Sequence, residues 1–383
     1  MGGGSGDAPA GARLRCLFVV QGEGRGHMTQ ALAMRGLLAS AGHEVVSVLM
    51  GRSARREVPG FFTRKIGAPV TCFDSPNFVC DGRDRAVRLW PTVVRNLRRA
   101  GAFRRSLRTI EAAVRAACPD VVVNFFEPMA GVYYRLRRPA PPMVCVGHQY
   151  MFHHPAYPFP PGRRLERWAA RWFTDLTAPA PARRLALSFY PAPDLPAARL
   201  GVVPPLLRPE VFVQPTDRRE PFFLVYLLNR GYADEILRWH EAHPDVVLHC
   251  FWDDAEHSDP YRYDATLTFH RLDDERFLAM MARCSGLVTT AGFESVSEAM
   301  YLGRPVLMVP VEGHFEQQCN ARDAAAAGAG LHAARFEIDR LIAYLPAYRS
   351  PAPAFGRWTS RAGDRFVAEI EAAARGARTP HPA

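Results

Sequence analysis

Twice along this chain, short runs of β-forming residues alternate with segments of helical periodicity. The β-rich runs span residues 17–20, 45–49, 121–125, 143–146, 222–228, 246–251, 287–290 and 306–309. The helical patterns span residues 28–41, 84–117, 234–242, 275–283, 293–302, 315–327 and 358–374. This alternation is typical of parallel sheets that are covered by helices. At 383 residues the chain is also too long for a single hydrophobic core, so two α/β units are predicted.

Proline is dense between residues 155 and 205, and no clear periodicity is maintained there. We interpret this stretch as loop-rich and place the end of the first unit in it. The predicted organisation is a tail at 1–12, a first domain at 13–205, a second domain at 206–353, a C-terminal helix within 354–376 and a tail at 377–383. In doubly wound sheets ligands bind beyond the carboxyl ends of the strands, so a site is expected in the loops that follow them.

The chain carries a net charge of +10, and nearly all its positive charge is arginine because Lys65 is the only lysine. Such a surplus favours an acidic partner, which can be nucleotide phosphates, nucleic acid or an anionic membrane. The densest basic stretch spans residues 95–108. We interpret it as a solvated helix face, with a peripheral membrane contact or an anionic acceptor surface as the alternative.

No segment indicates export or a membrane span. Residues 1–12 lack the basic and apolar regions of a secretory signal, and no apolar run approaches the roughly 20 residues of a membrane-spanning helix. The eight cysteines form no CxxC pair, so neither a zinc site nor a disulfide framework is predicted. A cytoplasmic protein is expected, with a peripheral location at the inner membrane face as the alternative.

The segment Gln21 to His27 reads QGEGRGH, directly after the first predicted strand and at the start of a helix. This is the context of a phosphate-binding turn, but the spacing is GxGxGH instead of GxGxxG. The second strand also ends without an acidic residue for a ribose hydroxyl, so a dinucleotide site is not indicated. Gly24 and Gly26 instead allow a close backbone approach to a ligand. His27 has the pKa range of a general base, with a capping or packing role as the alternative.

The segment 284–321 reads CSGLVTTAGFESVSEAMYLGRPVLMVPVEGHFEQQCNA, which predicts strand, glycine-containing turn, helix, turn, strand, loop and helix. The turn from Thr290 to Phe293 presents backbone N–H groups at a helix N-terminus, which is the chemistry of a diphosphate site. Ser295 can reach a phosphate oxygen from the first helical turn. Glu298 can accept two hydrogen bonds from a ribose diol, and the glutamines at 317 and 318 can bind hydroxyl-rich groups.

This segment resembles the donor-binding signature of GT-B glycosyltransferases. It is similar to the small-molecule UDP-glycosyltransferases and to the lipid-linked N-acetylglucosaminyltransferase of peptidoglycan synthesis. The resemblance implies an α/β protein with two doubly wound, Rossmann-like domains that face across a cleft, and a C-terminal helix that crosses back onto the first domain.

The resemblance also assigns roles in the second domain. Gly292 and Ser295 match the positions that hold the phosphates, and Glu298 matches the carboxylate that binds the ribose. Glu316 and Gln317 match the acidic–Gln pair that contacts the donor sugar, and a loop at 269–272 falls where the family recognises the base. The donor-binding residues expected in all are Arg230, Phe269, His270, Arg271, Leu272, Thr290, Gly292, Phe293, Glu294, Ser295, Glu298, Glu316, Gln317 and Gln318.

Three segments of the first domain agree with this family. GEGRGHMTQALAMRGLLASAGHEV, residues 22–45, resembles its first strand, loop and helix, whose histidine often serves as the base or lines the acceptor pocket. VVVNFFEPMAG, residues 121–131, and VCVGHQYMFHHP, residues 144–155, resemble a branch of uncharacterised bacterial and archaeal glycosyltransferases. The resemblance implies His27 as catalytic base with Glu127 in reserve, and His148 and Gln149 facing the cleft with Gly24 and Gly26.

Two departures qualify the donor site. Glu294 stands where small-molecule enzymes carry asparagine, and an acidic group beside a diphosphate is unfavourable unless it points away or pairs with an arginine. Arg230 is a candidate to offset the phosphate charge, with a surface role as the equal alternative. The carboxylates of WDDAEHSD, residues 252–259, are interpreted as a solvated loop, so neither a metal site nor another cofactor is expected.

The sequence therefore predicts an inverting, metal-independent glycosyltransferase of the hexosyltransferase type. Its donor is expected to be a nucleotide sugar, UDP-linked, and its acceptor a small molecule, a glycan or a lipid-linked hydroxyl. A nucleotide-sugar 2-epimerase of the same fold is one alternative. A non-enzymatic polyanion-binding protein is the alternative from another class, although no nucleic-acid partner is expected.

Overall fold

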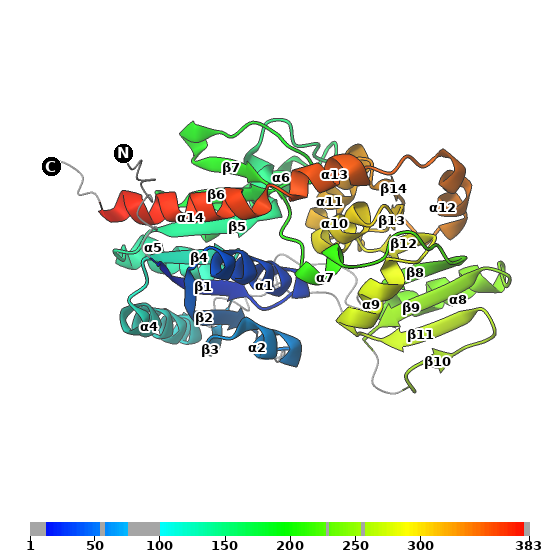
Figure 1. Cartoon of the computed structure of the whole chain (residues 1–383), viewed down its shortest axis with the longest axis horizontal. Coiled ribbons are helices and arrows are strands. Elements are labelled where there is room, and N and C mark those ends of the chain that lie inside the picture. Colours follow the sequence, from blue (N-terminus) through cyan, green and yellow to red (C-terminus); the bar gives the residue numbers. More distant parts are fainter. Residues whose placement is uncertain (1–12, 54–57, 76–99, 227–229, 254–256, 379–383) are drawn as a thin grey trace, which may run out of the picture.

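The computed structural model describes residues 13–53, 58–75, 100–226, 230–253 and 257–378. In these ranges two seven-stranded sheets lie side by side, with helices packed around each of them (Figure 1). None of the helices described here is both long enough and apolar enough to cross a membrane.

The first sheet has the strand order β3-β2-β1-β4-β5-β6-β7 and is parallel. Its elements are β1 (Arg15–Gln21), α1 (Arg25–Ser40), β2 (Glu44–Arg52), α2 (Gly60–Ile66), β3 (Val70–Asp74), α4 (Ala100–Ala117), β4 (Val121–Phe125), α5 (Pro128–Arg137), β5 (Met143–Gly147), η1 (His148–His153), α6 (Arg164–Thr177), β6 (Arg183–Leu187), η2 (Pro196–Ala198) and β7 (Leu200–Val203). The central strands β1 and β4 are buried almost throughout, as expected for strands that are covered on both faces.

The second sheet has the order β10-β11-β9-β8-β12-β13-β14, and only β10 pairs antiparallel among the described strands. After the connector helix α7 (Pro209–Phe212) come β8 (Phe222–Tyr226), η3 (Arg230–Tyr232), α8 (Ala233–Glu241), β9 (Val247–Trp252), β10 (Tyr261–Arg262), β11 (Leu267–Arg271), α9 (Asp274–Met281), β12 (Gly286–Thr289), α10 (Phe293–Tyr301), β13 (Val306–Met308), α11 (Phe315–Ala326), β14 (Gly330–His332), α12 (Ile338–Tyr344), η4 (Leu345–Ala347), α13 (Ala352–Thr359) and α14 (Ala362–Arg378).

Two expectations about loops are wrong. The proline-dense stretch 155–205 contains α6, β6 and β7, and the two strands complete the first sheet. Its prolines lie outside these three elements, where they interrupt neither helix nor strand pairing. The stretch 269–272 is not a loop, because its first three residues belong to β11. Of the expected basic helix, residues 84–99 are not fully covered by the described ranges, and α4 begins at Ala100.

The chain crosses twice between the two units. The first crossing is the connector that contains α7, and the second leads through α13 into α14, which lies along the first sheet (Figure 1). Phe366, Ile370 and Ala374 of α14 are buried in the main hydrophobic core. Arg183 of β6 donates two hydrogen bonds of 2.8 Å to Glu369, which ties the same helix to the sheet.

Candidate active site at the junction of the two sheets

Helix α10 begins directly after β12 and a tight turn formed by Thr290, Ala291 and Gly292. Ala291 has a φ of 64°, a left-handed conformation that costs a non-glycine residue about 1–2 kcal/mol. The side-chain amide of Asn320 on α11 donates to the Ala291 carbonyl over 3.2 Å and supports the turn. The partly positive N-terminus of α10 is thereby held at the junction of the two sheets.

The first turn of α10 is anchored by its own side chains. The Ser295 hydroxyl donates to the carbonyl of Gly292 over 3.2 Å. The ring of Phe293 stacks on His148, 4.1 Å away between centroids, and lies 4.6 Å from Phe189. Both aromatic partners belong to the first domain, so Phe293 fixes the helix N-terminus against that domain.

Glu294 points into the first domain. Its carboxylate accepts a hydrogen bond from the side-chain amide of Gln30 on α1. A Cβ at Gly26 would collide with this carboxylate, so the last glycine of QGEGRGH is what allows Glu294 to approach the loop. Burial raises the pKa of Glu294 to about 7. The acidic residue that is unfavourable beside a diphosphate is therefore directed towards the opening loop.

His27 lies half-buried at the start of α1. Its Nδ1 is 3.2 Å from the side-chain oxygen of Gln30, and its ring stacks on Phe126 at 5.7 Å between centroids. Because the Gln30 nitrogen donates to Glu294, the Gln30 oxygen faces His27 and accepts the Nδ1 proton. The neutral ring then keeps its lone pair on Nε2. Burial lowers the pKa of His27, and the charge of Glu316 opposes that shift.

The first turn of α11 carries the residues expected to contact the donor sugar. Glu316 accepts a hydrogen bond of 3.0 Å from Gln149 of the first domain. Gln318 accepts one of 3.2 Å from Arg163, also of the first domain. The Gln317 oxygen instead accepts from a backbone N–H in the preceding loop at 2.8 Å. Glu316 and Gln318 therefore face the first domain, whereas Gln317 orders the loop before its own helix.

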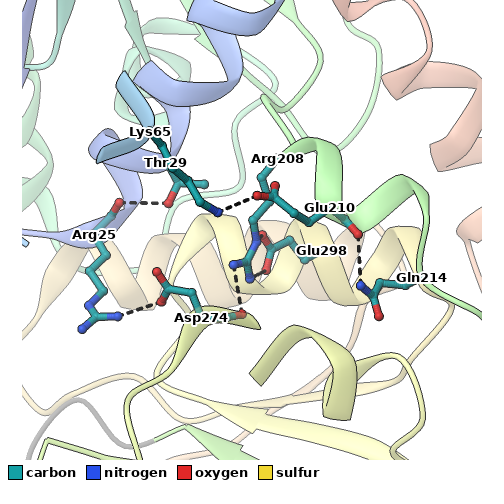
Figure 2. A network of polar contacts seen from close by, with 8 residues as sticks. All are labelled: Arg25, Thr29, Lys65, Arg208, Glu210, Gln214, Asp274 and Glu298. Carbon is teal, nitrogen blue, oxygen red and sulfur yellow. Dashed lines mark hydrogen bonds and ion pairs between the residues drawn. The ribbon is translucent and has the colours of Figure 1, made fainter. Parts of the chain in front are cut away.

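Glu298 is held by an arginine that no sequence motif indicated. Arg208, in the connector, donates from Nε and Nη2 to both carboxylate oxygens, at 2.6 and 2.9 Å (Figure 2). Its Nη1 reaches the carbonyl of Asp274 at 3.1 Å. Burial raises the pKa of Glu298 and outweighs the opposite effect of the Arg208 charge. A ribose diol at Glu298 would therefore share the carboxylate with Arg208 or displace it.

Ion pairs extend this network to the first domain. Arg25 of QGEGRGH pairs with Asp274 at 2.7 Å, and Lys65 of α2 pairs with Glu210 of α7 at 2.7 Å (Figure 2). All four side chains are partly exposed, so each pair contributes only about 0–1 kcal/mol. Their effect is to set the register of the two units and less to stabilise the fold.

The residues expected at the base site lie in β11 or directly after it. Phe269 is buried in the core of the second sheet, and His270 is buried with its ring 5.0 Å from that of Phe251 between centroids. Arg271 and Leu272 come at the carboxyl end of the strand, where such sheets bind ligands. Phe269 and His270 are thus used for packing, and the strand end leaves Arg271 and Leu272 nearer to a base.

Two groups of expected residues reach the limits of the described chain. The backbone of Arg230 begins η3, but its side chain lies outside the described part. Asp253 is exposed, and Asp254 falls outside the described ranges. Within the residues that are described, no group of three or more His, Cys, Asp or Glu is arranged to hold a metal ion.

Glu127, the reserve base, is completely buried as the N-cap of α5. Its Oε1 accepts hydrogen bonds of 2.7 Å from the Ser75 hydroxyl and 2.9 Å from the backbone N–H of Met129. A Cβ at Gly51 would collide with the same carboxylate. Burial raises the pKa of Glu127 to about 7. With no accessible surface, this carboxylate meets an acceptor only if the surrounding structure opens.

His148 takes part in a buried contact between the domains. Its Nδ1 donates to the carbonyl of Leu187 at 2.7 Å, and its Nε2 lies 3.6 Å from Oδ2 of Asp323 on α11. The Tyr190 hydroxyl donates to the other Asp323 oxygen at 2.7 Å. Burial lowers the pKa of His148 to about 4 and raises that of Asp323 to about 7. Between these values both groups are neutral, which permits their burial at the junction.

A family model decides what kind of protein carries this site. The model of glycosyl transferase family 1 matches residues 14–347, which is most of the chain. The chain belongs to this glycosyltransferase family. An uncharacterised glycosyltransferase of Methanosarcina acetivorans is 26% identical over 343 residues, which are 83% of each chain.

Solved structures share the fold of this glycosyltransferase. The calicheamicin glycosyltransferase CalG4 is 18% identical, with a TM-score of 0.63 over 96% of this chain and 100% of its own. UGT2 of Phytolacca americana is 13% identical, with a TM-score of 0.64 over 94% and 100%. MurG of Acinetobacter baumannii is 15% identical, with a TM-score of 0.53 over 94% and 99%. The GT-B fold and the enzyme class that the resemblance implied are confirmed.

Several residues of the glycosyltransferase junction were not predicted. Gln30 follows His27 by three positions on α1, a spacing that places both on one helix face and that could have indicated their contact. Arg208 is the single arginine of the stretch VVPPLLRPEV, yet its partner Glu298 lies 90 positions away. Asp323 had no local signal either, because its partners come from the other domain.

Proposed function

We propose that this glycosyltransferase moves a hexosyl group from a UDP-linked sugar to an acceptor hydroxyl, with inversion and without a metal ion. The observation that carries the proposal is the chain of contacts from His27 through Gln30 to Glu294. It connects the opening loop of the first domain to the first turn of α10, and it leaves Nε2 of His27 as the basic nitrogen. The Phytolacca americana UGT2 structure is a complex with UDP-2-fluoro-glucose and pterostilbene, which supports a UDP-linked donor.

The proposed proton transfer uses the orientation of His27. Nε2 removes the proton of the acceptor hydroxyl as its oxygen attacks the anomeric carbon, and the bond from that carbon to the diphosphate breaks. The new imidazolium keeps its Nδ1 proton on the Gln30 oxygen, and Gln30 passes its dipole on to Glu294. Because the oxygen attacks opposite the diphosphate, the anomeric configuration inverts.

The departing diphosphate is placed at the N-terminus of α10. Unpaired N–H groups of the first turn and the helix dipole stabilise the negative charge that develops there. The Ser295 hydroxyl, which now donates to Gly292, can rotate to donate to a phosphate oxygen. These groups supply the charge stabilisation for which other transferases use a cation.

Substrate binding is proposed to replace contacts across the junction. Gln149 occupies the carboxylate of Glu316, and Arg163 occupies the amide of Gln318. Hydroxyls of the donor sugar would take over these hydrogen bonds when the two domains separate and close again. The contacts seen without substrate therefore mark the donor-sugar position.

A thermal-shift screen of UDP-, dTDP- and GDP-sugars tests the donor, since a ligand that binds the native state raises the melting temperature. A UDP-sugar is expected to give the largest shift. Glu298→Ala should weaken UDP binding about tenfold or more because hydrogen bonds to a charged group are lost. The matched control is Glu241→Ala on exposed α8. UDP binding by Glu298→Ala at parental strength would remove the ribose assignment.

Two other functions give different results in the same assays. A nucleotide-sugar 2-epimerase would form product without any acceptor. A polyanion-binding protein would show no stabilisation by any nucleotide sugar, and its DNA binding would fall steeply with salt. The cytoplasmic location remains a prediction, as does a membrane contact through residues 95–108, of which 95–99 lie outside the described ranges.

A further inference from the structure

Helix α6 presents an apolar face to solvent. Leu165, Trp168 and Trp172 are 82%, 68% and 56% exposed, and their spacing places them on one side of the helix. Tryptophan is highly buried on average in folded proteins. Two exposed tryptophans beside a leucine on one helix face therefore mark an interaction surface. We call these three residues the α6 face.

The opposite side of α6 is firmly packed. Thr174 and Thr177 are buried, and a Cβ at Gly131 of α5 would collide with the carbonyl of Leu176. Arg171 donates from Nε to a carbonyl of η1 at 2.7 Å. The helix is thus held on its inner side, and the α6 face cannot turn inwards without unpacking it.

The surroundings of the α6 face are positively charged. Residues 163–184 contain six arginines and only two carboxylates. Both carboxylates are paired, Glu166 with Arg163 at 2.7 Å and Asp175 with Arg184 at 2.9 Å. Arg164 and Arg167, on the same helix, are exposed. An occupant of this surface must therefore be apolar at its centre and anionic around it.

We propose that the α6 face docks onto the surface of an anionic lipid bilayer. Tryptophan is favoured at the level of the lipid headgroups, where its ring meets apolar chains and its N–H remains hydrated. Exposed arginines beside it attract anionic headgroups, each by about 1 kcal/mol. A helix with these two features, lying flat on the domain surface, has the composition of an interfacial helix. The membrane contact is thereby assigned to α6 and not to residues 95–108.

The α6 face adjoins the junction of the two domains. Arg163, at the start of α6, reaches Gln318 on α11 at 3.2 Å, and its guanidinium lies 5.9 Å from the centre of the Phe315 ring. A bilayer on the α6 face therefore lies beside the first turn of α11. If the proposed glycosyl transfer is correct, an acceptor hydroxyl carried by a lipid reaches the site from the membrane surface. The docking itself does not depend on that activity.

Co-sedimentation with vesicles tests the docking without donor or acceptor. The full chain is mixed with phosphatidylcholine vesicles that contain about one-third phosphatidylglycerol, an anionic content chosen to give a clear surface potential. We expect binding that weakens with salt, and a blue shift of tryptophan fluorescence. Trp168→Ser with Trp172→Ser should reduce the partition coefficient at least about tenfold. Arg164→Gln with Arg167→Gln should reduce it about tenfold on anionic vesicles only.

Two control variants and two further measurements keep the proposal open to failure. Tyr263→Ser and Arg238→Gln change exposed residues of the second domain and should leave vesicle binding at the parental level. Equal binding by the tryptophan variant and the parent would overturn the proposal. So would a lower melting temperature of that variant in solution without vesicle binding by the parent, which indicates that the chain itself covers the face. A parental dimer that the tryptophan variant abolishes, again without vesicle binding, would assign the face to a second copy.

Discussion

Two histidine–carboxylate contacts cross the junction of the sheets, and they differ in what lies between the two groups. At His27 the amide of Gln30 separates the ring from Glu294 and bonds to both. At His148 the ring faces Asp323 directly, with 3.6 Å between Nε2 and Oδ2. His27 is half-buried, whereas His148 is buried beneath the ring of Phe293.

The difference indicates separate tasks. Burial raises the pKa of both carboxylates to about 7, so proximity of an acid does not distinguish the two contacts. What distinguishes them is that Gln30 fixes one tautomer of His27 and leaves Nε2 towards the junction, while the Nε2 of His148 faces a buried acid. We therefore assign proton transfer to the first contact and closure of the junction to the second.

Alanine at each histidine separates the two tasks most strongly. His27→Ala should lower the transfer rate by about 100- to 10,000-fold, the usual contribution of a general base, with little change in melting temperature. His148→Ala should instead lower the free energy of unfolding by about 2–4 kcal/mol, because it removes a stacked, hydrogen-bonded ring from a packed site. Rates and thermal unfolding of both variants check this. Parental transfer by His27→Ala would remove the base assignment.

Gln30→Leu tests the amide between His27 and Glu294. The substitution keeps the bulk of the side chain but removes the acceptor that holds the Nδ1 proton, so His27 can adopt either tautomer. We expect kcat to fall about tenfold while KM for the donor stays near the parental value. The variant Thr29→Val, on the same helix, serves as the control. A variant whose kcat is unchanged would show that Gln30 does not orient the base.

Asp323→Asn tests the closing contact through its pH dependence. Burial raises the pKa of Asp323 from 3.8 to about 7, so the native state keeps a proton that the unfolded chain loses between these values. Relative to Asp323→Asn, the parent should therefore lose stability as the pH rises from about 4 to about 7, by on the order of 2 kcal/mol. Thermal unfolding across that range measures it. Parallel pH curves for the two proteins would contradict the assignment.

The fold was largely predictable because its signals are local. Alternating strands and helices indicate two parallel sheets, and the turn at Gly292 was recognised from its glycine and its position before a helix. The strands β6 and β7 were missed because prolines surround them and β6 begins with two arginines, at 183 and 184. Base recognition was assigned to Phe269, whose alternation with exposed neighbours in β11 was not considered.

The contacts of the site were less predictable because they join distant parts of the chain. Gln30 and Glu294 are 264 positions apart, and Tyr190 and Asp323 are 133 apart. Each residue is ordinary in its local context, and only the approach of the two domains makes it informative. Sequence motifs could therefore indicate His27 and Glu294 separately, but not the amide that connects them.

The protonation of His27 near neutral pH tests the central claim most directly. Nitrogen NMR spectra of the protein with ¹⁵N-labelled histidine, compared with those of His27→Ala, identify the two ring nitrogens of His27. The account predicts a neutral ring with the proton on Nδ1 and an unprotonated Nε2, and it predicts that Gln30→Leu mixes the two tautomers. A proton held on Nε2 in the parent would contradict the assignment of His27 as the base.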